Sequence, residues 1–128
     1  MITAGVPLPS VNQLHHNIYG RAPADVVAFC QAHNIHVQSY SPLGVPDHIS
    51  FKPPCAPVLL EDPVLLSIAA AHGMTPAQVV LAHQWAEGIS ANPRTMDALH
   101  MIEDINAAGM SDLLTADEIA QLDSRPQC

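Results

Sequence analysis

Short extended segments alternate along this chain with helices whose ends are marked by capping residues. Asp62 and Pro63 begin a helical pattern that stops at Gly73, in the order of an N-cap, an N1 proline and a C-terminal glycine. Two further helices open with capping boxes, Thr75-Pro-Ala-Gln78 and Thr115-Ala-Asp-Glu118. The alternation predicts an α/β protein whose parallel sheet is covered by helices, with extended segments at 6–12, 35–40 and 89–92.

Two other helices and one long loop complete the predicted arrangement. A helix opens at Pro23, since proline suits the first helical turn, and ends near Asn34. Another follows residues 93–95 and carries Leu99, Ile102 and Ile105. Residues 41–61 contain five prolines and are predicted to form a loop. Connections of this length are uncommon in compact domains and are often functional.

Composition limits the chemistry open to this chain. With 128 residues, 48% of them hydrophobic, the chain suits one domain or part of one. Its formal net charge of −8 disfavours nucleic acid and anionic membrane surfaces as partners. We find neither a signal-peptide pattern nor an apolar run of about 20 residues, and expect a cytoplasmic protein. Cys30, Cys55 and Cys128 lack paired spacing, and we expect reduced thiols.

Polar residues gather where extended segments end. The three groups are Asn12-Gln13, the run from Tyr40 to Gly44, and Pro93-Arg94-Thr95. In a parallel α/β sheet such positions share one carboxyl edge, where ligands are held. An amide, an aromatic ring, turn amides and an arginine can together bind a carboxamide, stack on a ring and hold phosphates. The set predicts a site for a phosphorylated nucleotide.

Seven separated motifs resemble the aldo-keto reductase family in order and spacing, from about Pro9 to Leu122. They are Val11-Asn12-Gln13, Phe29-Cys30 with Asn34-Ile35, Ser39-Tyr40-Ser41-Pro42-Leu43-Gly44, Leu60-Glu61-Asp62-Pro63, Ile68-Ala69 with His72-Gly73, Thr75-Pro76-Ala77-Gln78-Val79 and Asn92-Pro93-Arg94-Thr95. The resemblance implies a partial (β/α)8 TIM barrel. Residues 1–128 would form a single segment, the C-terminal part of that barrel, with its last three strand-helix units and the C-terminal helices.

The resemblance also implies a nicotinamide-nucleotide pocket. Gln13 would hydrogen-bond the nicotinamide carboxamide, and Tyr40 would stack on the nicotinamide ring. The turn Ser41-Pro42-Leu43-Gly44 would lie along the pyrophosphate. Arg94 and Thr95 stand where the family places a Lys-Ser pair around the adenosine 2′-phosphate. Because Arg94 keeps that charge and adds a planar fork suited to phosphate, NADP(H) is favoured over NAD(H).

The adenosine side of that pocket departs from the family pattern. His100, Glu103 and Asp104 fall where the family usually has Arg, Glu and Asn near the phosphate and adenine. A neutral histidine is a weaker phosphate partner than arginine, and Asp104 adds a negative charge where an amide is usual. The departures predict weakened binding of the adenosine end.

The family's catalytic set of Asp, Tyr, Lys and His would lie upstream of this segment. The only lysine here is Lys52, in the proline-rich loop, and the only tyrosines are Tyr19 and Tyr40. We therefore name no catalytic residue in this chain. A complete barrel would reduce aldehydes or ketones to alcohols by hydride transfer, and only there would a small carbonyl substrate bind. The 128-residue chain alone is expected to show no turnover.

Two other functions compete with this one. A non-catalytic fragment or interaction module would self-associate, or dock on another chain, through the exposed edges of a three-stranded sheet. A metal site built on the eight histidines has little support. His15-His16 would point to opposite strand faces, and no cysteine or carboxylate stands at zinc-site spacing around them. We therefore predict no metal ligands.

Overall fold

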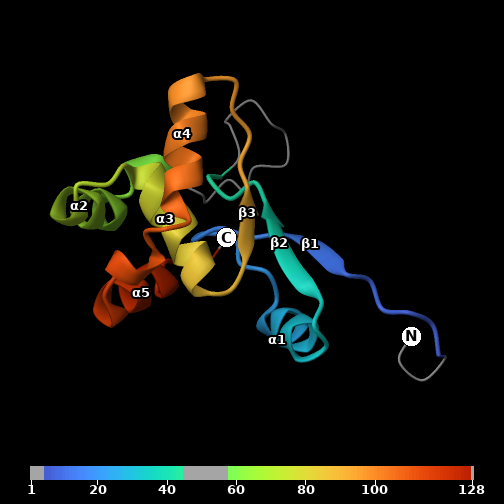
Figure 1. Ribbon diagram of the computed structural model, residues 1–128. Coiled ribbons are helices and arrows are strands. Elements are labelled where there is room, and N and C mark those ends of the chain that lie inside the picture. The colour runs from blue at the N-terminus through green and yellow to red at the C-terminus, as the bar shows by residue number, and fades with distance from the viewer. Residues whose placement is uncertain (1–4, 45–57, 128) are drawn as a thin grey trace.

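The computed structural model describes residues 5–44 and 58–127. Three strands form one parallel sheet in the order β1-β2-β3, and this part of the chain also contains five α-helices and two short 3-10 helices (Figure 1). In chain order the elements are β1 (Val11–His15), α1 (Ala24–Ala32), β2 (His36–Tyr40), η2 (Leu59–Glu61), α2 (Pro63–His72), α3 (Pro76–Ala86), β3 (Ser90–Asn92), α4 (Ala98–Ala107), η3 (Ser111–Leu113) and α5 (Ala116–Asp123). The predicted α/β class with parallel strands is confirmed.

The first strand lies later in the chain than predicted. Extension was expected over residues 6–12, but pairing begins where the His36 amide donates to the Ser10 carbonyl, and β1 runs to His15. Pro7 and Pro9 have no amide proton to give to a neighbouring strand, so the ladder starts after them. Consequently Gln13 lies within β1 and not at its end.

The predicted caps are confirmed. The Asp62 carboxylate accepts from the amides of Val64 (2.8 Å) and Leu65 (3.2 Å), and Gly73 ends α2 with a φ of 63°. Both capping boxes form, at the starts of α3 and α5. Side-chain caps of this kind satisfy amides that have no partner within the helix, which is why they locate helix starts so well.

Two boundaries differ from the sequence prediction. Pro23 is the N-cap of α1 and not its first residue, because its ψ of 126° is extended. Residues 59–61 form η2 inside the segment predicted as loop, closed by the Glu61 amide donating to the Val58 carbonyl at 3.0 Å. Most of that predicted loop, residues 45–57, lies outside the described residues.

The buried apolar residues form two clusters on the helix side of the sheet. The larger joins α2, α3 and α5 to Ile18 and Tyr19. The smaller packs Cys30 of α1 against the start of β2 and against Ile89, just before β3. Together the clusters fix the sheet from one side only.

Helix α4 contacts the body through one side and turns its apolar side away from it. Ala107 is buried and Glu103 and Asp104 are half-buried, whereas Leu99, Ile102 and Ile105 are all exposed. The helix predicted around these three residues is confirmed, but they do not contribute to either core cluster.

Among the residues that the structure describes, no single helix is long and apolar enough to cross a membrane. Helices α2 and α3 reach that length and composition only when taken together, and they are bent by 90° at the break between them.

Candidate functional site

The carboxyl ends of the three strands lie in one row. His15 pairs with Tyr40, and Tyr40 pairs with Asn92. The turn 41–44 follows β2 directly, and residues 93–95 follow β3. Gln13 lies one row deeper, opposite Gln38. The structure therefore aligns the strand ends on which the candidate residues stand and places Gln13 beneath them.

The sheet face turned away from the helices is polar. On β2, Val37 and Ser39 are buried against the helix side, while His36 and Tyr40 are exposed on the other side. By strand alternation, the open face carries Val11 together with the polar residues Gln13, His15, His36, Gln38, Tyr40, Ser90 and Asn92. The interior of a closed barrel is dominated instead by Val, Ile and Leu. This face is better suited to water or a polar ligand.

Tyr40 offers an aromatic surface at the row of strand ends. Its side chain is 43% exposed, and the His15 ring lies beside it with centroids 5.4 Å apart and planes at 59°. Burial and the neighbouring His16 lower the pKa of His15 below its usual value near 6.5, which keeps the ring neutral at pH 7. The pair therefore presents a neutral aromatic patch.

The Gln13 side chain is already partly engaged. Its Nε2 donates to Oε1 of Gln38 at 2.8 Å, on the same open face. The second amide proton and the carbonyl oxygen of Gln13 remain able to pair with a carboxamide. A second link joins Nε2 of His36 to Oγ of Ser90 at 2.7 Å. These cross-strand bonds hold the polar side chains of the face in place.

Two buried amides hold the turn after Tyr40. Nδ2 of Asn17 donates to the Ser41 carbonyl at 3.2 Å, and Nε2 of Gln84 donates to the Pro42 carbonyl at 3.4 Å. The Gly44 amide donates to the Ser41 carbonyl within the turn, so it is not free to bind a ligand. Ser41 has a φ of 52°, a left-handed conformation that non-glycine residues seldom adopt. Asn17 and Gln84 were not singled out by sequence, because their partners are distant in the chain.

Arg94 and Thr95 lie between β3 and α4, where Asp97 dominates the local charge. Arg94 is exposed, and Oγ1 of Thr95 accepts from the Asp97 amide at 3.0 Å. The Asp97 carboxylate caps α4 by accepting from the amides of Leu99 (2.7 Å) and His100 (3.3 Å), and these bonds lower its pKa. Asp97 was missed, although aspartate before a helical run is a recognisable N-cap.

The remaining candidates lie on α4. His100 is exposed, while Glu103 and Asp104 are half-buried on the side toward α3. The Glu103 carbonyl accepts from Nε2 of Gln78 at 3.3 Å. Partial burial raises the pKa of Asp104, and Glu103 adds to that effect. The first turns of α4 therefore carry three acidic groups and one histidine near the proposed adenosine end.

A family model described as the aldo/keto reductase family matches residues 1–125. The chain belongs to the aldo-keto reductase family. The resemblance drawn from its motifs is thereby confirmed. Aldo-keto reductase family 1 member A1 of Bos taurus is 35% identical over 116 residues, which make up 91% of this chain and 34% of that protein. The NADH-dependent D-xylose reductase of Candida parapsilosis is 35% identical over 121 residues, 90% of this chain and 36% of that one.

Solved aldo-keto reductases share the arrangement of these strands and helices. The crystal structure of a reductase of the silkworm Bombyx mori superposes with a TM-score of 0.76 at 32% identity, covering 96% of this chain and 36% of that one. Its complex with NADPH gives a TM-score of 0.78 with the same identity and coverage. This aldo-keto reductase chain thus spans about a third of the length of its relatives, and its three parallel strands match part of their barrel.

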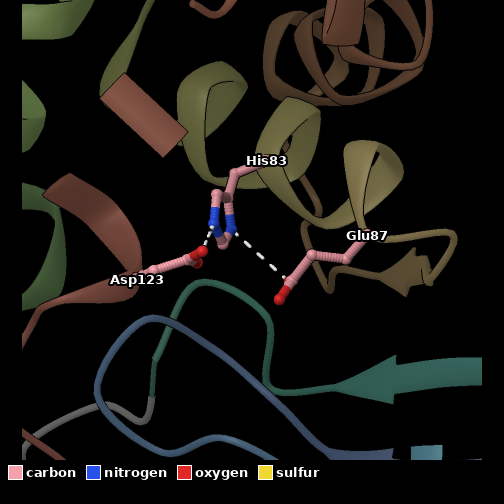
Figure 2. A group of neighbouring side chains, drawn as sticks. All are labelled: His83, Glu87 and Asp123. Atoms are coloured by element: carbon pink, nitrogen blue, oxygen red, sulfur yellow. Dashed lines mark hydrogen bonds and ion pairs between the residues drawn. The ribbon is translucent and has the colours of Figure 1, made fainter. Parts of the chain in front are cut away.

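A buried ionic network joins the end of β1 to α3 and α5 in this aldo-keto reductase chain. His83, of which 1% is exposed, lies between Glu87 and Asp123, as Figure 2 shows, with Nε2 2.9 Å from Oδ1 of Asp123. Nε2 of His16 is 2.9 Å from Oε2 of Glu87. The Arg21 guanidinium reaches both carboxylates, at 3.1 Å to Glu87 and 2.5 Å to Asp123. Two acids, an arginine and two histidines thus share one cluster.

The charges in this network support one another. Burial alone would raise the pKa of Glu87, but the hydrogen bond from His16 and the nearby cations outweigh it and lower that pKa. Burial likewise opposes ionisation of Asp123, and the bonds from His83 and Arg21 again lower its pKa. The Ala22 amide donates to Nδ1 of His16, so the proton of that ring sits on Nε2 and points at Glu87. Both acids are therefore ionised at neutral pH.

The same cluster has the residue types of a metal site. The ligand atoms of His83, Glu87 and Asp123 all lie within 4.8 Å of one another. However, Arg21 already binds both carboxylates, and a divalent cation between them would lie against its guanidinium. We assign the cluster to ion pairing. His83 and Glu87, four apart on one helix face, were visible in the sequence, whereas Arg21 and Asp123 are 102 residues apart.

A second buried group contains the other tyrosine. Tyr19 donates its hydroxyl to Oδ2 of Asp62, and Nη2 of Arg125 approaches the same oxygen at 2.6 Å. Burial raises the pKa of Tyr19, and its bond to Asp62 raises it further. A general acid needs an accessible proton and a pKa close to the working pH. The Tyr19 hydroxyl is buried and engaged, and it ties the β1–α1 loop to the start of α2.

Proposed function

We propose that this chain forms the last three strand-helix units of an NADP(H)-dependent aldo-keto reductase and retains the nucleotide-binding part of its site. The observation that carries the proposal is the exposed Tyr40 in the row of aligned strand ends, on a sheet face that is polar rather than packed. The NADPH complex of a related reductase, similar over 96% of this chain, supports the choice of ligand.

The proposed roles follow from the chain's own groups. Tyr40 with His15 provides a flat, neutral surface on which a nicotinamide ring can stack. Gln13 beneath it offers a free amide proton and a carbonyl oxygen to the carboxamide. The turn 41–44, fixed by Asn17 and Gln84, lies along the path of the pyrophosphate. The bound nucleotide supplies the hydride, while these residues bind and orient it.

The adenosine end fits less well than the nicotinamide end. Arg94 can pair with a 2′-phosphate, and this favours NADP(H) over NAD(H). The Asp97 carboxylate already occupies the first amides of α4, where an anion would otherwise bind. We therefore expect weak binding that still discriminates between the two nucleotides.

The isolated chain should bind nucleotide without turning it over. The catalytic set implied by the family would be contributed from outside this segment, and the Tyr19 hydroxyl is bound to Asp62. Carbonyl-dependent oxidation of NADPH by the pure chain, if lost on Tyr40→Ala substitution, would contradict this expectation.

Calorimetric titration of the purified protein tests nucleotide binding. We expect NADPH to bind about tenfold more tightly than NADH and Arg94→Ala to remove that difference. Tyr40→Ala should weaken both nucleotides about five- to tenfold, since an aromatic contact is lost. Phe29→Ala, which removes an exposed aromatic side chain from α1, serves as the matched control and should change neither affinity. Absence of binding, or equal effects of Tyr40→Ala and Phe29→Ala, would refute the proposal.

A second function, an interaction module, is favoured by one specific observation. Helix α4 directs its apolar side away from the rest of the described protein. Contiguous apolar surface of this kind commonly marks a protein interface.

A further inference from the structure

His15 is a titratable side chain in contact with the aromatic surface proposed to hold the nicotinamide. It is the last residue of β1 and pairs with Tyr40, the last residue of β2. The two rings have centroids 5.4 Å apart and planes tilted by 59°. His15 is half-buried, and Tyr40 is exposed. A change in the charge of His15 therefore takes place beside the ring on which a nicotinamide would stack.

The His15 ring is also packed against the loop that follows β1. A Cβ atom at position 20 would lie 2.8 Å from Cε1 of His15 and 3.1 Å from Nδ1. Side chains do not pack this closely, so the ring lies in space that is open because residue 20 is glycine. The backbones of Asn17 and Gly20 donate to each other at 3.1 and 3.2 Å and close the loop at this point. Contacts on two sides thus hold the ring beside Tyr40.

No acidic group fixes the charge of His15. Within residues 5–44 and 58–127, no hydrogen bond or ion pair involves its ring, and burial and the adjacent His16 lower its pKa. Its neighbour on β2 contributes the Tyr40 hydroxyl, and the turn 41–44 carries no titratable side chain. The Arg21 guanidinium, on the loop after β1, is bound to two carboxylates of the ionic network. A proton on His15 therefore adds a positive charge that none of these groups neutralises.

The two redox forms of a nicotinamide nucleotide differ in charge at the ring that would meet this surface. The oxidised ring is a cation, and the reduced ring is neutral. Because close-stacked aromatic rings have centroids about 4.5 Å apart, a ring stacked on Tyr40 would lie within about 10 Å of His15 on either side of Tyr40. At that separation two positive charges near a protein surface still repel each other.

We infer that His15 determines how strongly the site discriminates between the oxidised and the reduced nucleotide, by carrying a positive charge in acid and none at neutral pH. The inference rests on the proposed nucleotide site. With His15 neutral, the face of Tyr40 can accept a cationic nicotinamide. With His15 protonated, that cation is repelled and the neutral reduced ring is not. The affinity for NADP⁺ relative to NADPH should therefore fall about three- to tenfold when His15 is protonated.

Calorimetric titrations of the purified 128-residue protein with NADP⁺ and with fresh NADPH, from about pH 8 to about pH 5, test this. Both nucleotides have the same adenosine end, so protonation of its 2′-phosphate or of His100 affects both affinities alike and cancels in their ratio. The imidazole proton resonances of His15 report its protonation in parallel. We expect the affinity ratio to follow that titration curve. Because NADP⁺ and the proton oppose each other, NADP⁺ binding in acid should also release protons to the buffer.

Two substitutions fix the charge at position 15. His15→Gln is neutral at every pH used and should hold the ratio at the value that the wild type shows near neutral pH. His15→Lys is charged throughout and should hold the ratio at the lower value that the wild type approaches in acid. His36→Gln is the matched control, because His36 is exposed on the same sheet face but lies ~13 Å from Tyr40 along β2. It should retain the wild-type pH dependence, and circular dichroism at each pH verifies folding.

The outcomes separate this inference from the proposed function. If neither nucleotide binds at neutral pH, the proposed function fails and the inference fails with it. If both bind but their affinity ratio stays constant while His15 titrates, the assignment of His15 alone is overturned. A His15 ring that stays neutral down to about pH 5 would overturn it as well, as would equal effects of His15→Gln and His36→Gln on the pH dependence.

Discussion

Substitution of Glu87 by glutamine tests the buried ionic network with little change in shape. The carboxylate accepts from Nε2 of His16 and from Nη1 of Arg21, and lies 3.5 Å from Nδ1 of His83. The new side-chain amide could still accept one of these bonds through its oxygen, but its NH₂ group would face the other donor. The variant therefore loses about one hydrogen bond to a charged group and leaves a donor unpaired, which costs roughly 2 kcal/mol at this partly exposed position.

Urea denaturation at pH 7 measures that loss through the single tryptophan, Trp85, and through circular dichroism. A change of about 2 kcal/mol corresponds to a midpoint lower by about 1 M urea for a protein of this size. Glu61→Gln is the matched control, because it makes the same chemical change at an exposed residue of η2. If Glu87→Gln and Glu61→Gln unfold at the same urea concentration, the network does not stabilise the fold as argued.

The same variant carries a pH signature. Because the pKa of Glu87 is lower in the folded protein than in the unfolded chain, its contribution is fully present above the unfolded value of about 4.3. That contribution is lost as the pH falls through the lower folded value. The stability difference between wild type and Glu87→Gln should therefore be constant near neutral pH and shrink below about pH 4. A difference that grows on acidification would refute the assigned ionisation.

Three other substitutions probe the remaining polar contacts. Asp62→Ala removes the cap of α2 and leaves Arg125 without its carboxylate, so the free energy of unfolding in urea should fall by about 3 kcal/mol. Ser39→Ala removes the donor to the buried Gln84 side chain and should cost about 1–2 kcal/mol in the same assay. Asp97→Ser keeps a cap on α4 but removes its charge, and calorimetry should show NADPH binding roughly two- to fivefold tighter. Unchanged affinity in Asp97→Ser would show that no phosphate approaches that helix end.

Local signals in the sequence were sufficient to predict most of the elements. The caps of α2, α3 and α5 depend on hydrogen bonds between residues two or three apart in the sequence. Their sequence pattern therefore predicts them without knowledge of the fold. The alternation of apolar and polar residues in 35–40 likewise predicted β2. The ordered motifs, taken together, predicted the family although each is short.

Features that depend on contacts between residues distant in the chain could not be predicted from these local signals. The network around Glu87 joins Arg21 to Asp123 across 102 residues, and no local pattern relates them. Gln84 resembles an ordinary helix residue, yet it is fully buried and bonds the turn after β2. The amphipathic pattern predicted α4 but not which side of the helix contacts α3. Periodicity shows which residues share a helix face, but not whether that face is turned toward the rest of the protein.

The strand ends and the start of α4 differ in what they offer to a bound nucleotide. Tyr40 and the neutral His15 ring present an uncharged surface, to which a nicotinamide ring can add without desolvating a charge. Asp97, Glu103 and Asp104 instead place carboxylates on and before the helix proposed to meet the phosphate. In the proposed complex, the nicotinamide contacts should therefore contribute more of the affinity than the adenosine contacts.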